Sequence, residues 1–176
     1  GNASLRDEAA GIIGRDVADE IWGKLPPRKK GWRILGIVGR KDDPVAIFGE
    51  ALVRSGFAPA ETVWTETVVL DALKRLAAEK TDKHGGLLVF VDEMGKMLEA
   101  VARGHGDVHL IQQVAEIASR SGGRLIFVGI LHQAFDEYAA KLSRDLRDDW
   151  TKIHGRFIDL PVNVGTEEQI AILSRA

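Results

Sequence analysis

The chain has 176 residues, 45% of them hydrophobic and 28% charged, which fits one globular domain with its own core. Its formal net charge of −2 gives no overall attraction to nucleic acid or to an anionic membrane, and no apolar run approaches the ~20 residues of a membrane span. The absence of cysteine excludes disulfides and thiolate metal sites, and fits a reducing compartment such as the cytoplasm.

The first three residues, Gly-Asn-Ala, lack an initiator Met and resemble the remnant of a cleaved tag. We therefore expect residues 4–176 to form a single domain that is part of a longer protein. From Ser4 to Ile21, apolar residues recur at three- and four-residue spacing, which predicts a helix ending near Gly23. The next apolar segment, Trp32 to Val38, is predicted to be a strand.

Two further helices precede the most informative segment. Asp42 or Asp43 is placed to cap a helix with Pro44 at its first position, running to Gly56. A connection containing Pro59 and Trp64 leads to a predicted helix over residues 66–80.

The sequence Gly86–Lys96, GLLVFVDEMGK, joins an unbroken apolar run to the two acids Asp92 and Glu93. A run of this length and composition is typical of a strand buried on both faces. The acids would then lie at the carboxyl edge of a parallel sheet, where open α/β proteins bind ligands, and would suit a hydrated cation or an activated water. The alternative is structural: Asp92 as a helix cap and Glu93 as an acid in the first turn.

The second half of the chain continues the alternation of strands and helices, which predicts right-handed parallel crossovers. The predicted fold class is therefore three-layer α/β, with a mainly parallel sheet and helices on both faces. The expected elements are helices over 95–102 and 108–119, a strand over 124–130, a helix over 134–142, the segment 144–150, a short strand over 157–160 and a last helix from Thr166.

Three segments in this order resemble the AAA-type P-loop ATPases. Leu87 to Glu93 is similar to a Walker B strand, RLIFVGILHQ (124–133) to the following sensor strand, and IHGRFIDLPVNVGTEEQIAIL (153–173) to a Gly-Arg-Phe, strand, Pro and helix passage. The resemblance implies a P-loop NTPase-like fold for the domain.

The same resemblance implies roles for five residues. Asp92 would hold Mg²⁺ through water and Glu93 would be the catalytic base. His132 or Gln133 would lie near the γ-phosphate, and Arg156 would be a finger that reaches the nucleotide of a neighbouring subunit. For His132 the alternative is a polar cap of the next helix, and for Arg156 it is a salt bridge within the chain.

The phosphate-binding motif G-x-x-x-x-G-K-[ST] is missing from the sequence. The nearest loop, Gly36 to Asp43, has no glycine directly before a lysine and no hydroxyl residue after it. Either the chain begins after that motif, so that residues 4–22 are the helix that normally follows it, or the protein is a degenerate relative. We expect Mg²⁺ and ATP to be cofactors of the full-length parent, with neither held by this chain, which also lacks the family's lid.

The function implied by the resemblance is ATP hydrolysis coupled to the remodelling of an assembly. The parent would be the ATP hydrolase, and this fragment alone would be inactive. Expected partners are other domains of the parent or subunits of a homo-oligomer, with no membrane. ATPases of this kind often act on DNA, although the charge balance does not support a nucleic-acid partner.

A second function class stays open: a non-catalytic interaction or regulatory module that keeps an ATPase-like scaffold. One further motif, His105-x-Asp107-x-His109, has the spacing of a metal site or of a solvated loop.

Overall fold

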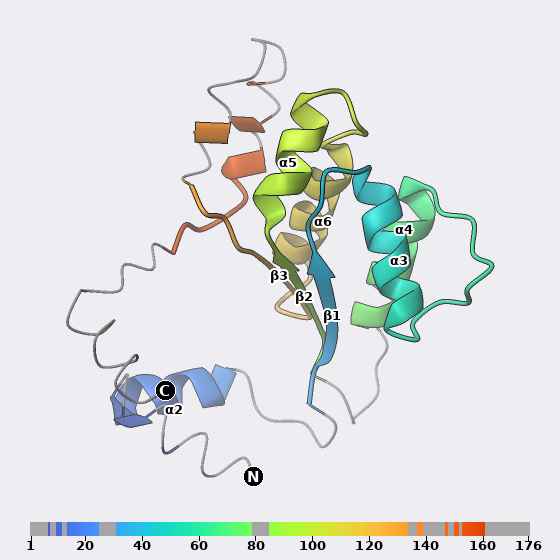
Figure 1. Cartoon of the computed structure of the whole chain (residues 1–176). Coiled ribbons are helices and arrows are strands. Elements are labelled where there is room, and N and C mark those ends of the chain that lie inside the picture. The colour runs from blue at the N-terminus through green and yellow to red at the C-terminus, as the bar shows by residue number, and fades with distance from the viewer. Residues whose placement is uncertain are drawn as a thin grey trace, which may run out of the picture.

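The computed structural model describes residues 7, 10–11, 14–24, 31–78, 85–133, 137–138, 147, 150–151 and 153–160. In this part of the chain a helix precedes the first strand, and two helices separate each strand from the next (Figure 1). They are α2 (Arg15–Lys24), β1 (Arg33–Val38), α3 (Pro44–Arg54), α4 (Glu66–Ala78), β2 (Leu87–Asp92), α5 (Met94–Ala102), α6 (His109–Arg120) and β3 (Leu125–Gly129).

The three strands form a parallel sheet in the order β1-β2-β3, so the strand that ends in Asp92 is central. Arg33 pairs with Leu87, and Leu87 pairs with Leu125. The prediction of an α/β fold with a parallel sheet is confirmed for this part of the chain.

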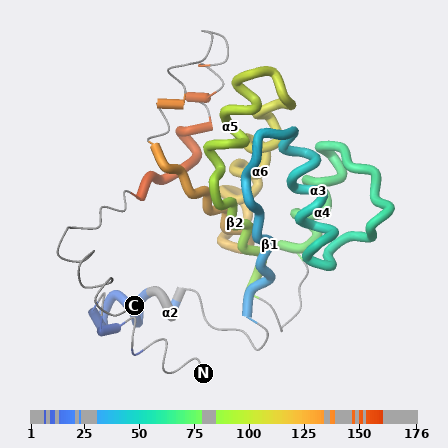
Figure 2. The backbone as a smooth tube through the Cα atoms, viewed as in Figure 1, coloured from blue at the N-terminus to red at the C-terminus, as the bar shows by residue number. Residues whose placement is uncertain are grey.

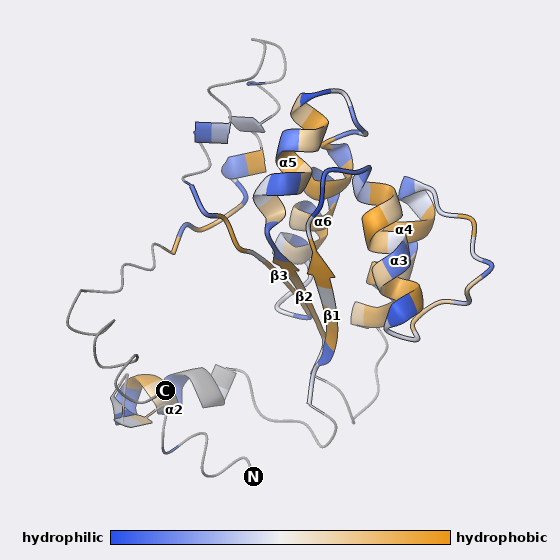
Figure 3. Cartoon of the chain, viewed as in Figure 1, coloured by the Kyte–Doolittle hydropathy of each residue, from blue (hydrophilic) through white to orange (hydrophobic). Residues whose placement is uncertain are grey.

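Helices α3, α4, α5 and α6 pack with one face of the sheet into a single apolar core. The inward strand residues include Leu35, Val89 and Leu125, which are buried together with Phe48 of α3 and Ile111 of α6. Figure 3 shows the apolar sides of these helices gathered toward the strands. The connections between neighbouring strands are expected to be right-handed, which places all of their helices on the same side.

The opposite face of the sheet has no helix over it among the described residues. Ile34 and Val38, which point to that face from β1, are 60% and 59% exposed. The predicted second layer of helices is therefore missing from the described part of the chain. The physical reason is the strand order: consecutive strands are also neighbours, so their crossover helices gather on one side.

Local sequence signals place the starts of α3 and α2. The carboxylate of Asp43 accepts a hydrogen bond from the backbone N–H of Val45 and Pro44 is the first helical residue, as predicted. The long helix predicted from Ser4 is instead interrupted at Gly14, which has a φ of 89°, and α2 begins at Arg15. The connection between α3 and α4, residues 55–65, extends away from the sheet (Figure 2).

The strand predicted at residues 157–160 is wrong. This segment has no regular structure, and its apolar residues Ile158 and Leu160 are 87% and 82% exposed. Phe157 packs on Phe127 of β3, with ring centroids 5.4 Å apart, and does not extend the ladder. Most of the predicted segments 134–142 and 144–150, and the helix from Thr166, lie outside the described residues.

Before residues 157–160, Trp150 and Ile153 are buried in the core. No helix within the described ranges combines the length and the apolar character needed to cross a membrane.

Candidate functional site

The carboxyl edge of the sheet gathers polar residues from all three strands. Residues 39–43 follow β1. Asp92 is the last residue of β2, and Glu93 comes directly after it. His132 and Gln133 come shortly after β3. Because the strands are parallel, these segments meet at one edge, which is where open α/β sheets bind ligands.

Asp92 has an exposed side chain at the end of the central strand. Its Oδ1 accepts a hydrogen bond of 2.9 Å from the backbone N–H of Glu93, and its backbone carbonyl accepts one of 2.7 Å from Gly39. No cluster of three or more metal-ligating side chains occurs among the described residues. Asp92 therefore offers one exposed carboxylate at this edge, and Mg²⁺ is an ion that proteins often bind through one or two carboxylates with most of its waters kept.

Glu93 has a left-handed backbone, with φ 52° and ψ 36°, and is the one non-glycine residue with positive φ in the described part of the chain. This conformation is unfavourable for a side chain with a Cβ. A close approach by Gly39 enforces the turn: a Cβ at Gly39 would lie 2.3 Å from the carbonyl oxygen of Glu93. The residue after Glu93 is held from the direction of β3: the backbone N–H of Met94 donates to the carbonyl of Ile130, directly after that strand, at 3.0 Å.

The carboxylate of Glu93 forms an ion pair with Lys96, one turn along α5. The Glu93 side chain is 30% exposed, so solvent reaches it. This pairing fixes the carboxylate beside the start of α5 while leaving a water molecule access to it.

A cavity of about 210 Å³ opens beside Glu93. It brings together three of the residues predicted to form the site: Glu93, His132 and Gln133. Two lysines and two glutamates line it, and Lys41 pairs with Glu99 at 3.4 Å. The lining residues are Lys41, Glu93, Gly95, Lys96, Glu99, His132, Gln133 and Tyr138.

Tyr138, which the sequence did not indicate, closes one wall of this cavity. Its side chain is buried, and burial raises the pKa of its phenol, with Glu99 acting in the same direction. The backbone N–H groups of His132 and Gln133 bond to the phenol oxygen and oppose that shift. Gly95 allows the contact, since a Cβ there would lie 2.2 Å from the phenol oxygen. The only sequence signal was that the chain has a single tyrosine.

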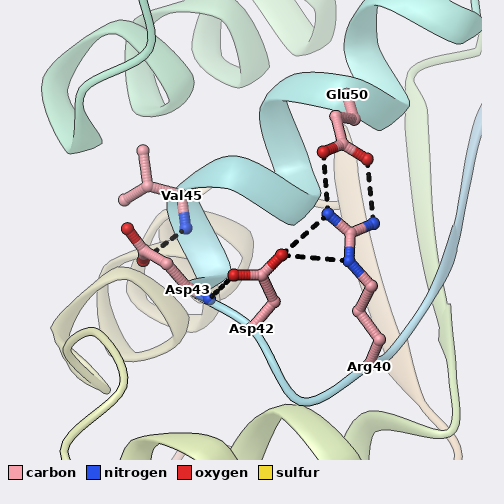
Figure 4. Close-up of polar contacts among 5 residues, drawn as sticks. All are labelled: Arg40, Asp42, Asp43, Val45 and Glu50. Carbon is pink, nitrogen blue, oxygen red and sulfur yellow. Dashed lines mark hydrogen bonds and ion pairs between the residues drawn. The ribbon is translucent and has the colours of Figure 1, made fainter.

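Arg40 organises the loop after β1 (Figure 4). Its guanidinium bonds both carboxylate oxygens of Glu50, at 2.8 and 2.7 Å, and Asp42 at 3.1 and 3.2 Å. These bonds raise the pKa of Arg40. The backbone N–H of Asp43, and then Arg40, lower the pKa of Asp42. The network holds the loop that carries Gly39 and Lys41 to the site.

Arg156 lies apart from the residues that line the cavity. Its guanidinium contacts the carboxylate of Glu116, on α6, at 3.3 Å, and its side chain is 30% exposed. A finger was expected to project without a partner in its own chain, and the structure instead gives Arg156 an intrachain partner. The finger role stays a prediction, and the structural alternative has an observed contact.

The His105-x-Asp107-x-His109 motif forms a helix start. Asp107 accepts a hydrogen bond from the backbone N–H of His109 at 2.9 Å. The two ring nitrogens of His109 contact Glu66 at 2.7 Å and Gln113 at 3.1 Å. Both nitrogens are therefore engaged in tying α6 to the start of α4, which favours the structural interpretation.

A larger groove, of about 450 Å³, lies between α4 and α6 and away from the carboxyl edge. Its basic residues stabilise helix ends: Arg124 Nε, for example, donates to the carbonyl of Ala77 at 2.8 Å. None of the predicted site residues lines it.

Comparison of the chain with protein-family models, curated proteins and solved structures gives no match. Function must therefore be argued from the residues at the carboxyl edge.

Proposed function

We propose that this α/β unit is the metal- and water-handling part of a AAA-like ATPase domain, and that its full-length parent couples ATP hydrolysis to the remodelling of an assembly. The observation that carries the proposal is the backbone of Glu93. Strained conformations persist where the surrounding structure enforces them, and they concentrate at functional sites. Here the strained residue is an acid at the carboxyl end of the central strand.

Each residue has a defined task in this proposal. Asp92 holds Mg²⁺ through water, and Glu93 orients the attacking water and polarises it. His132 and Gln133 line the same cavity as Glu93, and one of them would lie near the γ-phosphate. Magnesium supplies charge neutralisation on the phosphate oxygens when it is bound.

The loop after β1 does not provide a phosphate cradle. The N–H of Gly39 donates to the carbonyl of Asp92, and Lys41 pairs with Glu99. Since these donors are engaged within the chain, tight phosphate binding requires polypeptide other than this loop. ATP turnover is accordingly assigned to the parent protein.

A second candidate is a non-catalytic regulatory module on the same scaffold. It is favoured by the ion pairs within the chain: Glu93 with Lys96 and Glu99 with Lys41 at the cavity, and Arg156 with Glu116 away from it. Side chains paired in this way can serve structure alone.

The substitution Glu93→Gln in the parent separates the two functions. If Glu93 activates water, nucleotide affinity stays intact while the hydrolysis rate falls by about 10² to 10⁴-fold. The matched control is Glu99→Gln, which removes a carboxylate from the same cavity but should leave turnover within a few-fold. Unchanged turnover in Glu93→Gln, or a parent without turnover, would favour the regulatory module.

Calorimetric titration of the isolated chain with Mg-ATP tests the missing cradle. We expect no measurable heat of binding and no phosphate release. Micromolar affinity would contradict this and would mean that another part of the chain cradles the phosphates.

A further inference from the structure

The second face of the sheet is apolar across all three strands. In the register of the ladder, Ile34 aligns with Leu88 and Ile126, and Gly36 aligns with Phe90 and Val128. Side chains that alternate along a strand point to opposite faces, so these six positions share the face turned away from the helices. Parallel sheets are normally covered on both faces.

This face, which we call the bare face, is open at β1. Ile34 and Val38 are 60% and 59% exposed, and a Cβ built on Gly36, midway between them, would meet no atom within 4 Å. Gly36 therefore leaves a shallow groove between two exposed apolar side chains.

The size of the bare face argues against a second copy of the chain as its cover. Three strands of this length span about 20 Å by 14 Å, on the order of 300 Å². A stable interface between separate proteins usually needs about 800 Å² from each partner. A segment of the same chain needs far less contact area, because the tether keeps its effective concentration high.

Helix α2 has the length, position and exposed apolar side chain to be that segment. Its ten residues are about 15 Å long, comparable with a strand of the sheet. Val17 on α2 is 49% exposed, and in Figure 1 the helix lies apart from the sheet. Eight residues join Lys24 to Arg33, a connection that reaches at most about 28 Å.

We propose that α2 closes over the bare face, antiparallel to β1, with Val17 seated in the groove at Gly36 between Ile34 and Val38. Val17 is about 10 Å from the end of α2 and Gly36 is about 10 Å from the start of β1, so an antiparallel placement brings Val17 opposite Gly36, with Ile34 and Val38 on either side. The docked helix supplies the missing layer of the fold. This proposal does not depend on ATPase activity.

Because the chain has no cysteine, an engineered pair can report the contact without background. Val17→Cys combined with Val38→Cys should form a disulfide within the monomer on mild oxidation, seen by non-reducing electrophoresis and mass spectrometry. Val17→Cys with Ile34→Cys is the second pair, for use if the first protein does not fold. The control joins Val17→Cys to Val63→Cys, since Val63 is 81% exposed in the connection between α3 and α4.

Cross-linking within the monomer in either test pair, and at least five-fold less in the control, supports the proposal. Disulfide-linked dimers would mean that a second copy covers the face. The absence of a disulfide in both test pairs, or equal cross-linking in the control, would also overturn it.

Gly36→Leu gives an independent readout, because a Cβ at Gly36 would meet no atom within 4 Å and the rest of the leucine side chain would fill the groove. Docking predicts a fall in Tm of several degrees and a several-fold loss of Val17–Val38 cross-linking. An unchanged or raised Tm with unchanged cross-linking would show that the face stays open.

Discussion

Glu93 combines a left-handed backbone with a carboxylate paired to Lys96. Glycine and alanine both remove the carboxylate, but glycine relieves the left-handed backbone whereas alanine keeps that penalty. We expect Glu93→Gly to be more stable than Glu93→Ala by about 1 kcal/mol in urea unfolding. Equal stabilities would mean that this backbone conformation is not unfavourable for a residue with a Cβ.

Gly39 makes the turn at Glu93 through a contact that a methyl group would block. We expect Gly39→Ala to lower the free energy of unfolding by about 1–3 kcal/mol, because its Cβ would overlap the backbone of Glu93. Gly11→Ala is the control, because a Cβ at Gly11 would meet no atom within 4 Å, and it should not lower stability by more than about 0.5 kcal/mol. Similar effects from both substitutions would contradict the proposed contact.

Asp42 makes part of the stability depend on pH. Its pKa is lowered in the folded protein by the N–H of Asp43 and by Arg40, so its stabilising contribution is fully present above the ordinary aspartate pKa of about 3.9. That contribution is lost as the pH falls through the lowered value. The stability difference between the native chain and Asp42→Asn should therefore be present at pH 7 and disappear at the acid end of the titration. If the stability difference between the native chain and Asp42→Asn persisted in acid, it would come from packing and not from the charge of Asp42.

At the scale of elements, strong local signals were sufficient for most of the described chain. The apolar runs predicted β1, β2 and β3, and the Asp43-Pro44 pair predicted the start of α3. The family resemblance placed Glu93 and His132 or Gln133 near the same phosphate, and these three residues line one cavity in the structure.

What the sequence did not predict depends on contacts between distant residues. Tyr138 reaches the cavity because Gly95 leaves room for its phenol, and Arg40 binds Glu50 across a loop and a helix. The apolar alternation of residues 157–160 suggested a strand, but no neighbouring strand pairs with that segment among the described residues. Neither the strand order nor the exposed second face could be derived from local patterns.

The start of α3 offers a direct test at this scale. Asp43→Ala removes the acceptor for the N–H of Val45 and should lower the free energy of unfolding by about 1 kcal/mol. Asp43→Asn keeps a side-chain oxygen and should retain most of that stability. If Asp43→Ala and Asp43→Asn lower the free energy of unfolding by the same amount, the charge of Asp43 and not its capping hydrogen bond stabilises the helix.

For the whole molecule, the parallel sheet sets the folding rate. Arg33 pairs with Leu87 and Leu87 with Leu125, separations of 54 and 38 residues. Such non-local pairing is slow, so stopped-flow refolding should occur over milliseconds to seconds. Refolding in microseconds would mean that local helix contacts dominate the transition state.

The connection between α3 and α4 has a practical consequence for studying this molecule. Residues 55–65 run outward from the end of α3 and return to the start of α4 (Figure 2), and Val63 within them is 81% exposed. Surface connections of this kind tolerate insertions, and doubling a loop adds only about 0.6 kcal/mol of closure entropy. A fluorescent reporter inserted there would label the chain without altering Asp92 or Glu93.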